Sequence, residues 1–160
     1  MPEFSIKTLV DSDREWARNI LRLNWGSEKV VVHSEVLFPA ELDGLVAWLK
    51  GNREGLVTYK INGEITEIVT LNALKPNLGI GTALINAVKT CARGSGCESI
   101  ILTTTNDNIQ ALRFYQRLGF HLKTLRVGVV IEARTDKPEI PLLGDDNIPI
   151  RDELDLEFAL

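Results

Sequence analysis

The sequence predicts one mixed α/β domain, and three observations support this prediction. Its 160 residues are enough for a core of ordinary size and too few for two separately folded domains. Residues 44–74 contain short apolar runs separated by turn signals, a pattern typical of antiparallel strands. After Gly79 the apolar residues take up helical spacing, and helical and extended patterns then alternate.

The N-terminal part of the chain predicts a strand, a helix and a second extended run. Residues 4–10 alternate in hydropathy well enough for an opening strand. Residues 11–13 (Asp-Ser-Asp) offer N-caps to an amphipathic helix over residues 14–25. Residues 29–37 are rich in β-branched side chains, which favours an extended conformation.

Residues 44–74 predict an antiparallel meander. The segment 51–55 (Gly-Asn-Arg-Glu-Gly) separates its first two apolar runs, and Asn62-Gly63 separates the second from the third. Asn-Gly between apolar runs is the strongest short hairpin signal. The meander should therefore end near Leu74.

Two helices and two strands are predicted to follow. Residues 81–92 have helical spacing, and Gly94 stands where a C-terminal cap belongs. Residues 98–105 predict a buried strand, and Gly119 closes the amphipathic helix that comes next. Residues 120–130 predict another strand.

The C-terminal part predicts a loop and a final strand. Residues 131–150 hold three of the six prolines and lack periodicity, so we expect a long ordered loop with at most one helical turn at its start. Residues 151–160 alternate cleanly, with Asp155 and Glu157 on the face opposite the leucines. This alternation predicts a half-exposed strand.

Composition and charge exclude several function classes. The net charge of -4 argues against binding to nucleic acid or to an anionic membrane. No apolar window is long enough to span a membrane, and Glu3 lies in a start without an apolar core, so we expect no secretory signal and a cytoplasmic protein. Cys91 and Cys97, with the distant His33 and His121, predict neither a disulfide scaffold nor a metal site.

The first candidate site is the glycine turn at residues 76–82 (Pro-Asn-Leu-Gly-Ile-Gly-Thr). Two glycines at a helix start let phosphate oxygens approach the unpaired N–H groups of the first turn. Alone the signal is weak, because a turn into a core helix explains it equally well. A dinucleotide fold would need a third glycine where Leu84 stands, and a phosphate-binding loop would need Gly-Lys-Ser/Thr.

The second motif makes a family resemblance specific. Residues 106–120 (NDNIQALRFYQRLGF) resemble the second conserved block of the GNAT N-acetyltransferase superfamily, and the glycine turn with the following TALINAV is similar to its acetyl-CoA pyrophosphate-binding block. Together with the meander, the resemblance covers about residues 55–126. It implies a single domain over residues 1–160 with a central, mostly antiparallel sheet flanked by helices on both faces. Residues 132–160 would supply a loop and the last strand.

The resemblance also implies roles for individual residues. The backbone around Leu71 and Asn72 would pair with the pantetheine arm of acetyl-CoA, Asn108 would bond that arm, and Tyr115 would stand near the thioester sulfur as general acid. The pyrophosphate would be held by residues of the glycine turn, namely Leu78, Gly79, Ile80, Gly81 and Thr82. The residues themselves allow other readings, since Asn108 can cap a helix and Tyr115 can be a core aromatic.

The sequence departs from the family pattern at Pro76, where the family usually has Gln or Arg, and the adjacent Lys75 could supply the missing cation. The amine acceptor must lose a proton, so a carboxylate or a water chain ending on one would help. Glu67 resembles the glutamate that some family members use as the base, and Glu64 is the second choice.

The resemblance predicts acetyl transfer from acetyl-CoA to an amine by direct attack in a ternary complex, without a metal. The alternative is a catalytically degenerate acyl-CoA-binding sensor or interaction module. The acceptor, a small-molecule or peptide amine, is not specified by the sequence, and a homodimer is compatible with it. Residues 24–26 (Asn-Trp-Gly) could border the acceptor pocket. If Asp155 and Glu157 lie near its mouth, the acceptor should be cationic.

Overall fold

A computed structural model describes residues 3–160, so the first two residues of the predicted domain lie outside it. The main sheet consists of β1 (Ser5–Thr8), β4 (Asp43–Leu49), β5 (Asn52–Asn62), β6 (Ile65–Ala73), β7 (Ser99–Thr105), β8 (His121–Arg126) and β9 (Glu153–Ala159). The α-helices are α1 (Arg14–Trp25), α2 (Ile80–Gly94), α3 (Ile109–Arg117) and α4 (Val129–Asp136). A separate hairpin is formed by β2 (Val30–Val32) and β3 (Glu35–Leu37).

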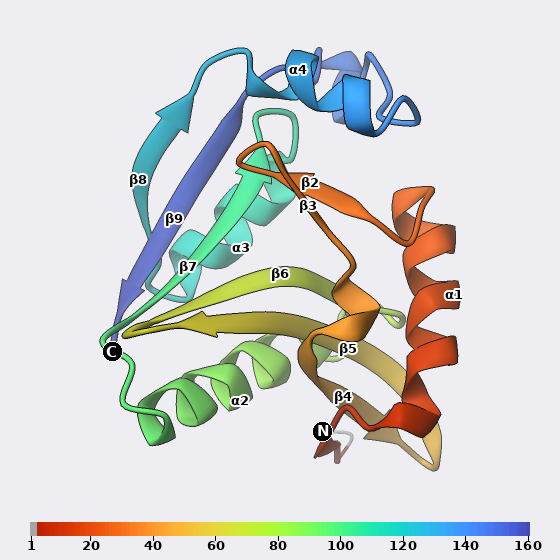
Figure 1. Ribbon diagram of the computed structural model, residues 1–160. Coiled ribbons are helices and arrows are strands. Elements are labelled where there is room, and N and C mark those ends of the chain that lie inside the picture. The colour runs from red at the N-terminus through yellow and green to blue at the C-terminus, as the bar shows by residue number, and fades with distance from the viewer. Residues whose placement is uncertain (1–2) are drawn as a thin grey trace.

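The strand order is β1-β4-β5-β6-β7-β9-β8, and every neighbouring pair is antiparallel except β6 and β7. In Figure 1, α2 lies against one face of the sheet, and α1 and the β2–β3 hairpin lie on the other. The predicted mixed α/β fold, with a mostly antiparallel sheet between helices, is confirmed. Within residues 3–160, no helix is long and apolar enough to cross a bilayer.

Alternation along the strands builds a core on each face of the sheet. Leu45 and Val57 belong to the cluster that includes α2 and α3, while Val46 and Leu56 pack with residues of α1. Successive strand residues point to opposite faces, so each strand serves both clusters. Both faces of the central strands are therefore covered.

The central parallel pair is short, and this creates an opening in the sheet. β6 and β7 pair only from Ile65 with Ser99 to Ile68 with Leu102. A bulge at the same level leaves Val69 without a Cα partner on β5, where Thr58 pairs with Thr70 and Tyr59 with Ile68. Beyond this point β6 and β7 diverge, as Figure 1 shows.

The structure corrects several sequence-based boundaries. The turn between β4 and β5 is Lys50-Gly51, because residues 52–55 already belong to β5. The left-handed residue after α2 is Gly96, with φ of 77°, whereas Gly94 is still helical. Gly119 closes α3 with φ of 94°, as predicted.

The C-terminal part of the structure differs more from the elements predicted from the sequence. The predicted strand ends at Arg126, and Gly128 with φ of 74° begins α4, which is longer than the single turn expected. The acidic face of β9 is only partly exposed, because Glu153 and Asp155 are buried beneath the β2–β3 hairpin while Glu157 keeps some exposure. The alternation was predicted correctly, but hydropathy alone does not show that a neighbouring hairpin covers the polar face.

Candidate functional site

A cavity of about 630 Å³ occupies the opening between β6 and β7. Its walls come from the diverging ends of these strands, the glycine turn, the start of α2, and α3. The predicted cofactor residues on its wall are Leu71, Gly79, Ile80, Gly81, Thr82, Asn108 and Tyr115. The fold thus brings together two motifs that are separated in the sequence.

The glycine turn presents the N-terminus of α2 to this cavity. Gly79 adopts a left-handed φ of 79°, and its carbonyl accepts the first helical bond, from the Ala83 N–H at 3.0 Å. The N–H groups of the three residues between them have no acceptor within the helix, and the helix dipole adds partial positive charge there. This end of the cavity is suited to bind an anion.

A glycine at position 81 keeps the helix start open to a ligand and also leaves room for Phe114 to pack against α2. A Cβ at this position would stand 3.2 Å from Cζ of Phe114 on α3, which is tighter than ordinary contact. The close approach of α2 and α3 at this point therefore leaves little room for a side chain at position 81.

The cation predicted to replace the family's Gln or Arg lies on the cavity wall but is paired. Lys75 Nζ is 3.0 Å from Oε1 of Glu54, and both Lys75 and Pro76 line the cavity. Glu54 therefore offsets part of the positive charge that Lys75 brings to the site.

Asn108 and Tyr115 occupy the α3 side of the cavity. The Asn108 side-chain oxygen accepts a 3.1 Å hydrogen bond from the Ala111 N–H, so it caps α3, and its amide nitrogen is left for another partner. The Tyr115 ring packs edge-on against Phe114 and Phe120. Burial raises the pKa of Tyr115 well above its ordinary value, so the phenol stays protonated.

Two predicted cofactor residues lie elsewhere. Leu78 packs against the core and lines neither cavity described here. Asn72 lines the second cavity, and its side-chain oxygen accepts a 3.4 Å hydrogen bond from the Trp25 indole.

That second cavity, of about 640 Å³, adjoins the first. The two share the residues Trp25, Val69, Thr103, Thr104 and Asn108. Residues 24–26, which were expected to border an acceptor pocket, line this second cavity. The remaining walls come from β2, α4, the segment after α4, and the start of β9.

The second cavity contains two buried carboxylates, Glu153 and Asp107, and the Asp107 carboxylate accepts hydrogen bonds from the Thr105 hydroxyl and the Asp145 N–H. Glu153 is 3% exposed, and its Oε1 accepts a hydrogen bond of 3.2 Å from the His33 backbone N–H. Burial raises the pKa of Glu153, while the His33 N–H and the charge of Arg126 oppose that change. A carboxylate with a raised pKa is suited to accept a proton.

The predicted base is not at either cavity. Glu67 lies on β6 before the bulge and lines neither space, and its Oε2 is 3.5 Å from Nζ of Lys60. Glu64 lies in the turn before β6, at the end of the strand opposite the opening. Both residues lie outside the two cavities, because the strands diverge only after Ile68.

The condition for a cationic acceptor is also not met. Asp155 contacts the Arg126 guanidinium and Glu157 contacts Lys123, and neither carboxylate lines the cavities. These acids are neutralised by cations of β8.

Sequence reasoning missed three buried charged residues of the second cavity, namely Asp107, Lys137 and Glu153. Glu153 stood on the face of β9 that was expected to be exposed, and Lys137 lay in the segment read as a loop. The one sequence feature that pointed to buried charges was the unusually charged face of the terminal strand. Among residues 3–160, no cluster of three or more potential metal-ligating side chains occurs.

A family model and a curated relative each match more than two thirds of this chain. Residues 10–120 match the model of the family described as "Acetyltransferase (GNAT) family". The uncharacterized protein YxbD of Bacillus subtilis (strain 168) is 46% identical over 132 residues, covering 82% of this chain and 83% of that protein.

Solved structures share the fold. An acetyltransferase of Bacillus subtilis in complex with CoA superposes with a TM-score of 0.70 at 16% identity, over 100% of this chain and 99% of that one. A GNAT family acetyltransferase from Elizabethkingia anophelis with acetyl-CoA bound gives 0.69 at 16% identity, over 98% of each chain.

Proposed function

Because this chain belongs to the acetyltransferase (GNAT) family, we propose that it is an N-acetyltransferase that transfers the acetyl group of acetyl-CoA directly to an amine in a ternary complex. The observation that carries the proposal is the junction of the two cavities at Val69, Thr103 and Thr104. One cavity ends at an anion-binding helix start and the other contains a buried carboxylate. A thioester and an amine held in them would meet where β6 and β7 diverge.

The first cavity would hold the co-substrate. The N–H groups of Ile80, Gly81 and Thr82 would receive pyrophosphate oxygens, helped by the α2 dipole. Beyond Ile68, β6 lacks a partner on β7, so its backbone groups are available to an amide-bearing arm such as pantetheine. Two proteins with this fold bind CoA or acetyl-CoA, which supports the assignment.

The second cavity would hold the amine. An ordinary amine has a pKa of about 10.4, so its deprotonation at neutral pH costs about 4.6 kcal/mol. Glu153, directly or through a water, would take that proton as the amine nitrogen forms its bond to the acetyl carbon. Glu153 replaces Glu67 in this role because only Glu153 lines the cavity.

Two further groups would assist the bond exchange. Val69 lies at the bulge without a Cα partner and lines both cavities, so its backbone N–H would stabilise the oxyanion on the acetyl carbon. As the carbon–sulfur bond breaks, the Tyr115 hydroxyl would donate to the departing thiolate. The raised pKa of Tyr115 keeps this donor protonated.

The test is acetyl-CoA turnover across a panel of amines, measured by thiol release. CoA at one hundred times its dissociation constant should add about 2.7 kcal/mol of stability and raise Tm by roughly 5 to 10 °C for a chain of this size. ATP and NAD should give no shift. A shift with CoA but no thiol release with any amine would instead favour the acyl-CoA-binding module.

A further inference from the structure

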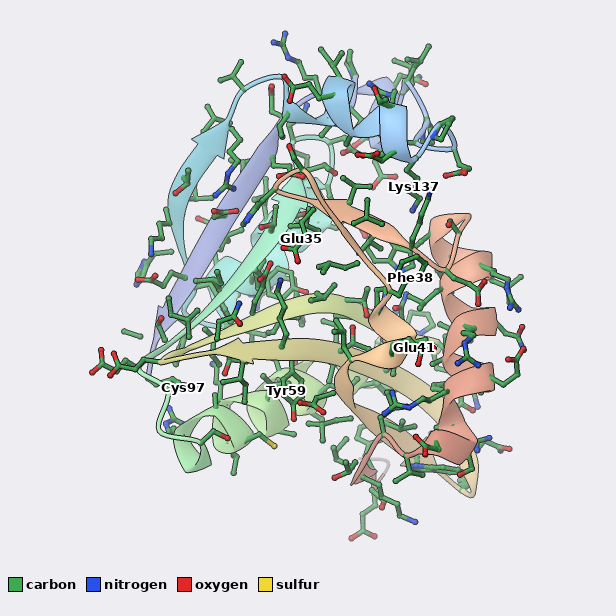
Figure 2. The ribbon with its side chains drawn as sticks, viewed as in Figure 1. Glu35, Phe38, Glu41, Tyr59, Cys97 and Lys137 are labelled. Atoms are coloured by element: carbon green, nitrogen blue, oxygen red, sulfur yellow. The ribbon has the colours of Figure 1, made fainter. Side chains whose placement is uncertain are left out.

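Lys137 is a buried cation without a protein partner. It ends α4, is 5% exposed and lines the second cavity. Its side chain forms no hydrogen bond or ion pair with the described residues, although buried Lys89, for comparison, donates a 3.0 Å hydrogen bond to the Leu118 carbonyl. Figure 2 shows the Lys137 side chain extending from the end of α4 toward the space beside β2.

The ammonium group faces the cavity. Within residues 3–160, no side-chain nitrogen or oxygen that is sealed from solvent lacks a hydrogen-bond partner. The unpaired Nζ of Lys137 is therefore open to the cavity space that its side chain lines. Burial lowers the pKa of Lys137 and the nearby cation Lys29 lowers it further, while Glu139 opposes them.

The surroundings make this cation conspicuous. The cavity wall near α4 is mostly apolar, with Val30, Val130, Ala133, Ile140 and Ile150. An ammonium in such a site is costly unless it is paired. Glu153 lines the same cavity but is bonded by the His33 N–H, and its own pKa is raised by burial. Among the described residues that line the cavity, Lys137 is the one basic side chain, and the acidic ones are Asp107, Glu139, Asp145 and Glu153.

We infer that the acceptor is a small amine that also carries an oxyanion, a carboxylate or a phosphate, which forms an ion pair with Lys137 while its amine lies at Glu153. The inference rests on the proposed function, because it identifies the class of acceptor for the same site. The oxyanion supplies the partner that Lys137 lacks. A neutral amine, or the α-amine of a peptide whose first carbonyl is an amide, would leave the lysine unpaired.

The experiment compares matched amines with and without the anion. Amino acids are paired with their carboxamides, and phosphoethanolamine is paired with ethanolamine, so that the two series separate a carboxylate from a phosphate. Values of kcat/KM come from thiol release with acetyl-CoA. The variants are Lys137→Met, which keeps the length of the side chain, Lys137→Arg, and the control Lys29→Met, which removes a neighbouring cation that does not line the cavity.

In the wild type, kcat/KM should be at least about tenfold higher for the anionic member of one series, since a charge-assisted hydrogen bond contributes roughly 1.5–3 kcal/mol. Lys137→Met should abolish that preference through KM and leave the neutral amines unchanged, Lys137→Arg should retain part of it, and Lys29→Met should retain most of it. Equal kcat/KM for the anionic and neutral members, or an unchanged preference in Lys137→Met, would overturn the inference.

A binding readout separates this inference from the proposed function. The same amines are titrated by calorimetry into the protein saturated with CoA, which cannot transfer acetyl. Binding of an anionic amine that Lys137→Met loses, without turnover of any amine, would support the anion site and contradict the acetyltransferase. If no anionic amine binds or reacts, the anion site is wrong, and turnover of neutral amines would still support the enzyme.

Discussion

Thr103, which lines both cavities, donates a hydrogen bond of 2.7 Å from its hydroxyl to Oδ1 of Asp155. The same carboxylate oxygen lies 2.9 Å from Nε2 of His33 and 2.6 Å from Nη1 of Arg126. This cluster joins β7, β8, β9 and the β2–β3 turn. It therefore holds the hairpin over the sheet and sets the position of the adjacent Glu153.

Asp155→Asn should destabilise the fold at neutral pH by about 2 kcal/mol, because hydrogen bonds to a charged group are replaced by weaker ones. Tm should fall by roughly 4 to 8 °C in a chain of this length. Urea unfolding measures the difference. Unchanged stability would show that the cluster contributes little.

The destabilisation should also depend on pH. Burial opposes ionisation of Asp155, but hydrogen bonds from Arg126, Thr103 and His33 prevail and lower its pKa. A group with a depressed folded pKa contributes stability above its ordinary value of about 3.9 and loses it as pH falls through the folded pKa. The difference between wild type and Asp155→Asn should therefore be full at pH 6 and shrink below about pH 4. A difference that grows in acid would contradict this assignment.

Gly81→Val should abolish CoA binding, since a branched side chain would stand at the helix start where the pyrophosphate approaches. Gly94→Val is the matched control, because Gly94 lies at the other end of α2 with open space around its Cα. The measurement is the rise in Tm that CoA causes. The Tm of each variant without CoA is measured as well, because a valine at position 81 also crowds Phe114. A normal rise in Gly81→Val would place the phosphate site elsewhere.

Tyr115→Phe should lower kcat about 10²-fold, with CoA affinity and Tm nearly unchanged because the ring still packs between Phe114 and Phe120. The raised pKa of Tyr115 means that its proton is retained through pH 9, so ionisation of this residue should cause no alkaline loss of turnover. Single-turnover measurements isolate the chemical step. Full turnover in the variant would assign the proton to water.

Glu153→Gln should lower kcat about 10²-fold at neutral pH, whereas Glu67→Gln should leave it unchanged because Glu67 lines neither cavity. The base works as a carboxylate, so activity should be lost as pH falls through a pKa that burial has raised above the ordinary glutamate value. His33 and Arg126 oppose that rise and Asp155 adds to it. Loss of turnover in Glu67→Gln but not in Glu153→Gln would restore the assignment made from sequence.

The glycine turn and the α3 side of the first cavity could be predicted from the sequence because their signals are local. A left-handed Gly79, a glycine where two helices approach, and an asparagine that caps α3 follow from the backbone rules of short segments. The helix boundaries predicted near these residues were accordingly close to the observed ones. The length of α4 was underestimated because its segment has no apolar periodicity. The helix is held by packing against β2 and by hydrogen bonds from Gly128, Val130 and Arg134 to the segment that follows it.

The acceptor side was decided by tertiary structure. Hydropathy assigned the acids of β9 to solvent, yet the hairpin folds over that face and buries Glu153 and Asp155. Glu67 has the right residue type on the right strand, but the parallel pairing continues to Ile68 and keeps it from the opening. The sequence by itself determined the family, the fold class and the position of the glycine turn, because motifs and hydropathy patterns are properties of short segments. Which charged groups meet at the second cavity depended on strand register and on contacts between segments more than 100 residues apart, because burial and charge pairing are properties of the assembled chain.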